Sequence, residues 1–86
     1  MKLYLNDLYA IERDDIVGIF DMDTATVGRD TRDFLRRGER EGRVTVTTGD
    51  IPVSFAVTAD KERNILIYFT RNAPRVLRRR VVSDRL

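Results

Sequence analysis

The sequence predicts an α+β domain, a small and mostly antiparallel β-sheet with one central amphipathic helix and a short C-terminal helix. Short β-prone runs fill residues 3–20 and 44–69, one run with helical periodicity separates them, and an arginine-rich helical segment follows. Strands that are segregated from helices are typical of the α+β class. The 86 residues contain no Pro-rich or Gly/Ser-rich boundary, so we expect residues 1–86 to form a single domain.

Strand signals open the chain. Leu3 and Leu5 alternate with polar neighbours, and residues 8–11 are apolar and compatible with a strand. Residues 16–20 (IVGIF) form a short apolar run between acidic residues. The length of this run and its β-branched residues predict a buried strand.

The central helix is predicted from its two faces. Residues 24–28 form a loop that leads into the helix, with Thr26 or Gly28 as the N-cap. The helix ends near Glu41, and Gly42 supplies the left-handed backbone geometry that ends many helices. On a helical wheel, a less polar face lies opposite a stripe of arginines. The first face consists of Val27, Thr31, Phe34, Leu35 and Gly38, and the stripe of Arg29, Arg32, Arg36 and Arg40.

Two strands are expected next. Residues 44–48 alternate, and residues 49–52 (GDIP) form a turn. Residues 54–58 (SFAVT) are the strand that returns from this turn, with Phe55 and Val57 on one face. The pattern is that of a β-hairpin.

The last strand and the last helix complete the domain. Residues 60–64 are a polar turn, and residues 65–69 (ILIYF) are the most β-prone run, which predicts a central strand. Asn72 is the expected cap of a short last helix, and Pro74 lies near its first position, where proline is favoured.

The composition argues against an enzyme. The chain has no Cys and no His, which excludes disulfides, thiol nucleophiles and essentially all zinc chemistry. It has no Gly-rich phosphate-binding loop, and its serines have no base partner. The acidic residues near strand ends are typical of solvated turns: Asp14, Asp15, Asp21 and Asp23. We therefore predict no catalytic residues, no metal, no cofactor and no small-molecule substrate.

Location and assembly follow from the same reasoning. The first ten residues lack the apolar core and cleavage site of a signal peptide. No apolar run approaches the roughly 20 residues of a membrane span. We therefore expect a cytoplasmic protein without a membrane partner. Because a domain this short has a marginal core, we also expect self-association to reinforce it.

Arginine dominates the charge pattern. The chain contains 14 Arg and only two Lys, and its net charge is −4 over residues 1–60 and +6 over residues 61–86. Guanidinium groups match phosphates well, so this asymmetry permits a nucleic-acid surface. Acidic residues interrupt the stripe on the central helix, whereas the C-terminal arginines have few compensating acids. The alternatives are an arginine-rich composition without a target, or ion pairs with the acidic region of a neighbouring subunit.

Three stretches carry a resemblance to a known family. They are residues 14–43 (DDIVGIFDMDTATVGRDTRDFLRRGEREGR), 52–60 (PVSFAVTAD) and 65–69 (ILIYF). In this order and at these spacings, the chain resembles the RemA/RemB extracellular-matrix regulators of spore-forming bacteria and looks closest to the RemB branch. The resemblance covers nearly the whole chain.

The resemblance implies a fold related to the LytTR type of DNA-binding domain. RemA-type members assemble into closed rings with DNA around the outside, and they activate matrix and osmoprotection genes through arginine contacts. One family arginine lies in the early strand region, where Arg13 is the nearest match. A Gly-Arg-Arg turn carries two more, and Ile51 and Pro52 replace that pair here. Either DNA contact has moved to the helix and C-terminal arginines, or this branch does not bind DNA in that way.

Two functions are therefore open. The first is a DNA-binding transcriptional regulator of biofilm matrix genes, which binds the double-stranded DNA backbone as a homo-oligomer, possibly a ring. The second is an assembly or adaptor protein that regulates through protein contacts. For the first, the candidate DNA-binding residues are Arg13, Arg36, Arg40, Arg71, Arg78 and Arg79.

Overall fold

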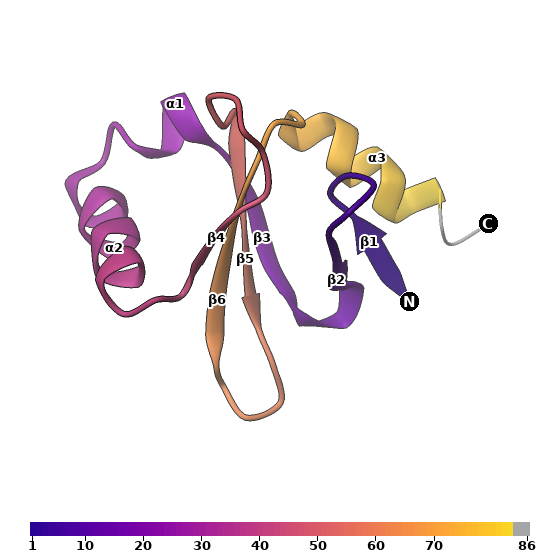
Figure 1. The fold of residues 1–86 in the computed structure, drawn as a ribbon, viewed down its shortest axis with the longest axis horizontal. Helices are drawn as coiled ribbons and strands as arrows, with labels where there is room; N and C mark the ends of the chain where they lie inside the picture. Colours follow the sequence, from indigo (N-terminus) through magenta and orange to yellow (C-terminus); the bar gives the residue numbers. More distant parts are fainter. Residues whose placement is uncertain (84–86) are drawn as a thin grey trace.

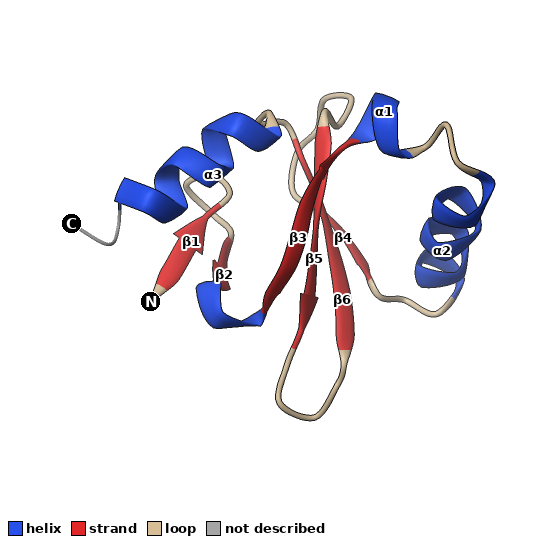
Figure 2. Cartoon of the chain, turned by 180° about the vertical axis from the view of Figure 1, so that it is seen from behind, coloured by secondary structure: helices blue, strands red, loops and turns tan. Residues whose placement is uncertain are grey.

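A computed structural model describes residues 1–83 of the chain, with side chains through Val81. The elements are β1 (Lys2–Tyr4), β2 (Ala10–Glu12), the 3-10 helix η1 (Arg13–Asp15), β3 (Ile16–Asp21), α1 (Met22–Ala25), α2 (Arg29–Arg40), β4 (Val44–Val46), β5 (Ser54–Ala59), β6 (Ile65–Thr70) and α3 (Pro74–Ser83). A four-stranded sheet forms the middle layer (Figure 1). Helix α2 lies on one side of it, and α3 lies with the β1–β2 hairpin on the other (Figure 2). The predicted α+β class is confirmed.

The central position of residues 65–69 is confirmed. The strand order is β3-β5-β6-β4, so β6 lies between β5 and β4. Strand β5 runs antiparallel to both of its neighbours, whereas β4 runs parallel to β6. The sheet is therefore mixed.

The hairpin predicted between residues 44–48 and 54–58 is wrong. Strand β4 pairs with β6, not with β5, and its register places Val44 opposite Ile67. The tight turn after β5 places β6 directly beside β5. Strand β4 therefore pairs with the other edge of β6. Alternating residues specify a strand and its inward face, but they do not specify its partner.

Residues 16–20 form a strand as predicted, but the prediction that this strand is buried is wrong. Strand β3 is an edge strand that pairs only with β5, and a β-bulge interrupts its register between Ile16 and Gly18. Ile19 is buried, but the side chain of Val17 is 64% exposed. A short apolar run indicates β-propensity, but central and edge strands both have it. The run therefore does not predict whether the strand is buried.

Two apolar cores lie on opposite faces of the sheet. Because side chains alternate along a strand, Phe55 and Val57 of β5 share a face, as predicted. That face lies toward α2, while Ala56 points to the other face. The buried residues of the α2 side are Leu35, Phe55, Val57 and Ile67. Those of the α3 side are Leu3, Leu5, Ile11, Ile19, Ala56 and Leu77. One sheet therefore needs a cover on each face.

The last helix begins at Pro74 as predicted, but Asn72 does not cap it. The side-chain amide of Asn72 donates a hydrogen bond to the backbone carbonyl of Leu5, 67 positions away. The hydroxyl of Ser54 donates to the carbonyl of Asn72. Asn72 therefore joins the N-terminal segment to the sheet at the point where α3 begins.

Helix α2 approaches the sheet most closely at a glycine. Gly28, one of the two predicted candidates, is the N-cap, and Gly42 has a φ of 72°, as predicted. Residues 22–25, part of which was expected to be loop, form the short helix α1. A Cβ atom on Gly38 would lie 2.7 Å from Cδ1 of Ile67. Gly38 therefore sets the distance between α2 and β6.

Replacing Gly38 with alanine tests this contact. Alanine is the better helix former, but its methyl group must displace the side chain of Ile67. Overpacking costs about 1–3 kcal/mol and the gain in helix propensity returns about 1 kcal/mol, so we expect Gly38→Ala to lower the free energy of unfolding by about 1 kcal/mol, measured by urea denaturation. The control Glu39→Ala, at the next and exposed position, is expected to stay within about 0.5 kcal/mol of the parent. A Gly38→Ala protein as stable as the control would contradict the close approach.

The turn between β5 and β6 depends on one carboxylate. Oδ1 of Asp60 accepts hydrogen bonds from the backbone N–H of Asn64 at 2.9 Å and of Glu62 at 2.8 Å. The bonds from Asn64 are the main cause that lowers the pKa of Asp60 below 3.8. Arg63 completes the turn in the left-handed region, with a φ of 66°.

This turn predicts a contribution to stability that depends on pH. A carboxyl group whose pKa is lower in the folded state stabilises the fold above its unfolded pKa and ceases to do so as the pH falls through the folded value. We expect the chain to be more stable than Asp60→Asn at neutral pH, and the difference to shrink as the pH falls below 3.8. Urea midpoints of both proteins across the acid range measure it, and a difference that grows on acidification would refute it.

Candidate nucleic-acid interface

The most basic element of the fold is α3. Four of its residues are arginines with exposed side chains: Arg75, Arg78, Arg79 and Arg80. No acidic residue occurs in the sequence between Glu62 and Asp84, so the helix and the segment that leads to it carry positive charge alone. This surface has the composition of a phosphate-binding site.

The buried residue Leu77 fixes how α3 presents its arginines. Leu77 is fully buried in the core on that face of the sheet. Arg75 and Arg79 lie two residues before and after it, a little more than half a turn away, so both point to solvent. Arg78 and Arg80 lie on the two flanks of the helix, nearer to the sheet.

The flanking arginines hold the helix in place. Arg78 Nη2 donates to the backbone carbonyl of Ile19 on β3 at 2.6 Å. On the other flank, Arg80 Nη1 donates to the carbonyl of Tyr4 on β1 at 2.9 Å. Each guanidinium has five N–H donors, so both groups keep donors for an additional partner. Of the predicted DNA contacts, Arg78 therefore also has a structural task.

The outward pair has no such task. Arg75 and Arg79 make no hydrogen bond or ion pair with the other residues that the structure describes. They are spaced i,i+4 on one helix face, where like charges repel. An anion placed between them would relieve this repulsion. Arg79 is one of the six DNA contacts predicted from the sequence, whereas Arg75 was predicted only as part of the C-terminal arginine cluster.

Arg36 and Arg40 lie on α2, which covers the opposite side of the sheet from α3 (Figure 1). Both are exposed and are again spaced i,i+4. A shallow surface hollow joins them to three neighbours on the helix: Asp33, Arg37 and Glu39. The structure therefore does not bring these two arginines together with those of α3, and acidic side chains lie among them.

The other arginines of the α2 stripe have partners within the helix and its N-terminal loop. Arg29 pairs with Asp33, with Nε and Oδ2 3.9 Å apart. Arg32 Nη1 donates to the carbonyls of Thr26 and Val27, both at 3.1 Å. The stripe predicted from the sequence is thus exposed but partly neutralised.

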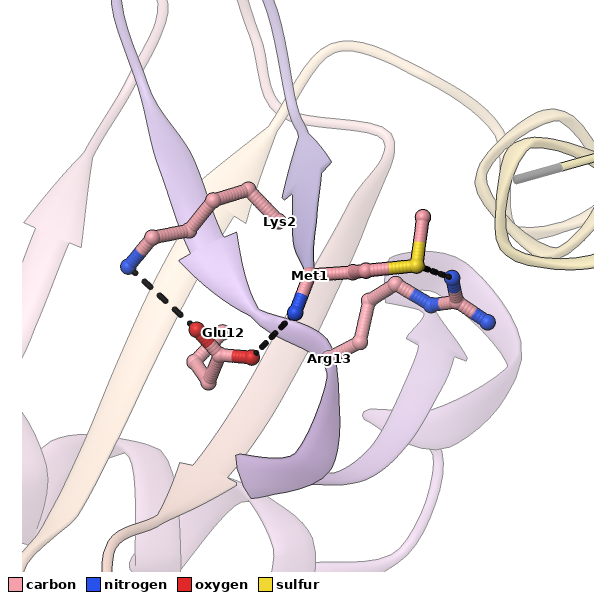
Figure 3. Close-up of polar contacts among 4 residues, drawn as sticks. All are labelled: Met1, Lys2, Glu12 and Arg13. Atoms are coloured by element: carbon pink, nitrogen blue, oxygen red, sulfur yellow. Dashed lines mark hydrogen bonds and ion pairs between the residues drawn. The ribbon is translucent and has the colours of Figure 1, made fainter. Parts of the chain in front are cut away.

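Arg13 begins η1, beside the start of β1 (Figure 3). Its Nη1 contacts Sδ of Met1 at 3.4 Å, and its side chain points away from the neighbouring Glu12. Glu12 instead contacts the amino group of Met1 at 2.9 Å and Nζ of Lys2 at 3.5 Å. The hydrogen bond from the amino group is the main cause that lowers the pKa of Glu12 below 4.5. The charge of Arg13 therefore has no carboxylate partner among residues 1–83.

Arg71 lies in the segment between β6 and α3, at the end of the sheet. Its Nε is 3.8 Å from Oδ2 of Asp50, and both side chains are largely exposed. A surface pair of this kind contributes little to stability, so Arg71 is available to another anion. Asp50 belongs to the GDIP turn, which also contains Ile51 and Pro52.

The acidic residues near the strand ends have local roles. Asp21 caps α1, with Oδ1 accepting from the backbone N–H of Thr24 at 3.0 Å, and Asp14 and Asp15 lie within η1. Within residues 1–83, no three acidic side chains are placed to hold a metal ion. In the same part of the chain, no helix combines the length and the apolar character that crossing a membrane requires.

Similarity to known proteins gives no independent guide. No protein-family model matches the chain, and a search of curated proteins finds no significant match.

Mutation can distinguish the structural role of Arg78, whose hydrogen bond to Ile19 clamps α3 to β3, from the outward arginines Arg75 and Arg79. We expect Arg78→Ala to lower the free energy of unfolding by about 1 kcal/mol, because it removes a charge-assisted bond to a backbone carbonyl. Arg75→Ala removes the same charge from the same helix and is expected to be nearly neutral. Urea denaturation of both variants measures the difference. Equal effects would contradict the clamp.

Proposed function

We propose that the chain is a DNA-binding transcriptional regulator of the RemA/RemB type, which acts in the cytoplasm as a homo-oligomer. The observation that carries the proposal is the exposed, acid-free surface of α3 with its outward pair, Arg75 and Arg79. The resemblance extends the proposal to a LytTR-related fold and to genes of the biofilm matrix. The proposed function requires binding but no catalysis.

Phosphate contact is the mechanism that suits this surface. Guanidinium groups that neutralise phosphates release condensed counterions, and this release supplies affinity without reading the base sequence. Arg75 and Arg79 would contact phosphates directly, while Arg78 and Arg80 would add spare donors beside them. The helix itself stays fixed by Leu77 and by the two flanking bonds.

Oligomerisation supplies the affinity that one subunit lacks. One α3 helix offers only a few phosphate contacts, and each contact is weak at physiological salt. Several copies on one duplex would act together, because binding by the first copy raises the effective concentration of the others. Such backbone contact favours DNA that bends easily over a particular base sequence.

The salt dependence of binding tests the proposal. We expect duplex DNA to bind with an affinity that falls steeply between about 50 and 200 mM salt. The double variant Arg75→Ala/Arg79→Ala should lower the slope of log affinity against log salt by about two for each subunit in contact. Fluorescence anisotropy with a labelled duplex measures both.

The control removes the same charge elsewhere. Arg29 and Arg43 are surface arginines that already pair with carboxylates, Asp33 and Glu41. Arg29→Ala/Arg43→Ala is expected to bind DNA nearly as the parent does. An affinity that does not change with salt, or equal losses in both double variants, would rule out the α3 surface as the DNA site.

The second candidate is an assembly or adaptor protein without DNA binding. It is favoured by an open apolar groove between α2 and β3, and by the apolar Ile51-Pro52 that replaces the family's arginine pair. In that case the arginines would pair with carboxylates of other subunits. Failure to bind duplex DNA at about 50 mM salt would favour this candidate.

A further inference from the structure

Helix α2 leaves part of its sheet face uncovered. It packs on β6 and β4, and beside it the side chains over β3 and β5 form a groove of about 320 Å³. Phe20 of β3 stacks on Phe55 of β5 in this groove, with ring centroids 5.3 Å apart. The lining residues are Val17, Phe20, Ala25, Asp30, Thr31, Phe34, Phe55 and Val57.

The chemistry of the groove selects a kind of occupant. Small-molecule sites enclose most of the ligand's surface, whereas this groove is open to solvent along its length, and its polar side chains are those of Asp30 and Thr31. Asp30 is exposed and has no ion pair within residues 1–83, and neither does Asp23 on the nearby α1. An apolar side chain with a neighbouring cation therefore fits the groove best.

Strand addition at the open edge of β3 is disfavoured. The bulge at Val17 disrupts the ladder, and Arg78 already occupies the carbonyl of Ile19. Bulges and charged side chains are common devices that protect edge strands from pairing. The occupant would therefore insert side chains into the groove, without extending the sheet.

The chain itself exposes a segment of the required chemistry. Ile51, in the loop between β4 and β5, is 82% exposed, and Val53 nearby is partly exposed. Arg71 lies beside this loop through its contact with Asp50. The loop and α1 lie at the same end of the sheet (Figures 1 and 2), and the N–H of Met22 bonds to the carbonyl of Val53. Ile51 and Arg71 together form an apolar knob with a cation.

We infer that the groove binds the Ile51 loop of a second copy of this chain, with Arg71 of that copy facing Asp30. This inference rests on the self-association in the proposed function and assigns it a surface. The knob of one copy occupies the groove of the next, which is a heterologous contact that can repeat around a closed ring. Arg71 would then serve assembly instead of DNA.

Two substitutions separate the knob from the groove. Ile51→Glu and Val17→Glu each place a charge at an exposed apolar position, so the fold should survive, as circular dichroism can verify. We expect each to raise the dissociation constant of self-association at least about tenfold, measured by light scattering during size exclusion. Asp30→Arg, on α2, tests the same groove through its charge.

Matched controls exist elsewhere in the fold. Leu8→Glu changes another exposed loop residue, and Val46→Glu changes an exposed residue on the other edge strand. Both are expected to associate as the parent does. A loss in the controls equal to that in the test variants would overturn the inference.

A mixing experiment identifies the occupant. Val17→Glu keeps an intact knob, and Ile51→Glu keeps an intact groove, so mixing them restores the contact between the knob of the first and the groove of the second. We expect the mixture to associate more tightly than either variant alone. If Ile51→Glu associates as the parent does, or if the parent chain stays monomeric, the inference is wrong. DNA binding by the α3 surface is measured separately with Arg75→Ala/Arg79→Ala, so its outcome does not depend on this one.

Discussion

Strand β5 imposes the constraint on which the rest of the structure depends. Five consecutive residues, 54–58, are buried, and their side chains alternate between the two faces of the sheet. Each face therefore needs its own cover. Helix α2 covers part of one face, and the β1–β2 hairpin with α3 covers the other. This two-sided burial separates the arginines of α2 from those of α3.

The sequence predicts well those features that arise from local contacts. The span of α2, the left-handed Gly42, the start of α3 at Pro74 and the shared face of Phe55 and Val57 follow from neighbours within one turn or one strand. Two features that arise from distant contacts were missed. They are the pairing partner of β4 and the edge position of β3. Both depend on which strands pair with each other, and the residues within a strand do not specify its partner.

The same division applies to the candidate site. The charge asymmetry of the sequence correctly marks the C-terminal segment as basic. It does not tell which arginines point outward, because that depends on Leu77 being the buried residue of α3. Arg78 therefore proved to bond to Ile19, and Arg75 emerged as part of the outward pair. Asn72 was expected to cap a helix, but its side-chain amide donates a hydrogen bond to the backbone carbonyl of Leu5.

The layered fold also makes the two proposed surfaces compatible. The groove lies on the α2 side of the sheet, while Arg75 and Arg79 lie on the helix that covers the opposite side. Copies that dock through the groove would therefore leave their α3 helices uncovered. Because Arg78 and Arg80 hold α3 by backbone carbonyls, the outward arginines keep a fixed orientation in each copy. A set of fixed cationic helices, repeated by assembly, is the arrangement that phosphate binding by several subunits requires.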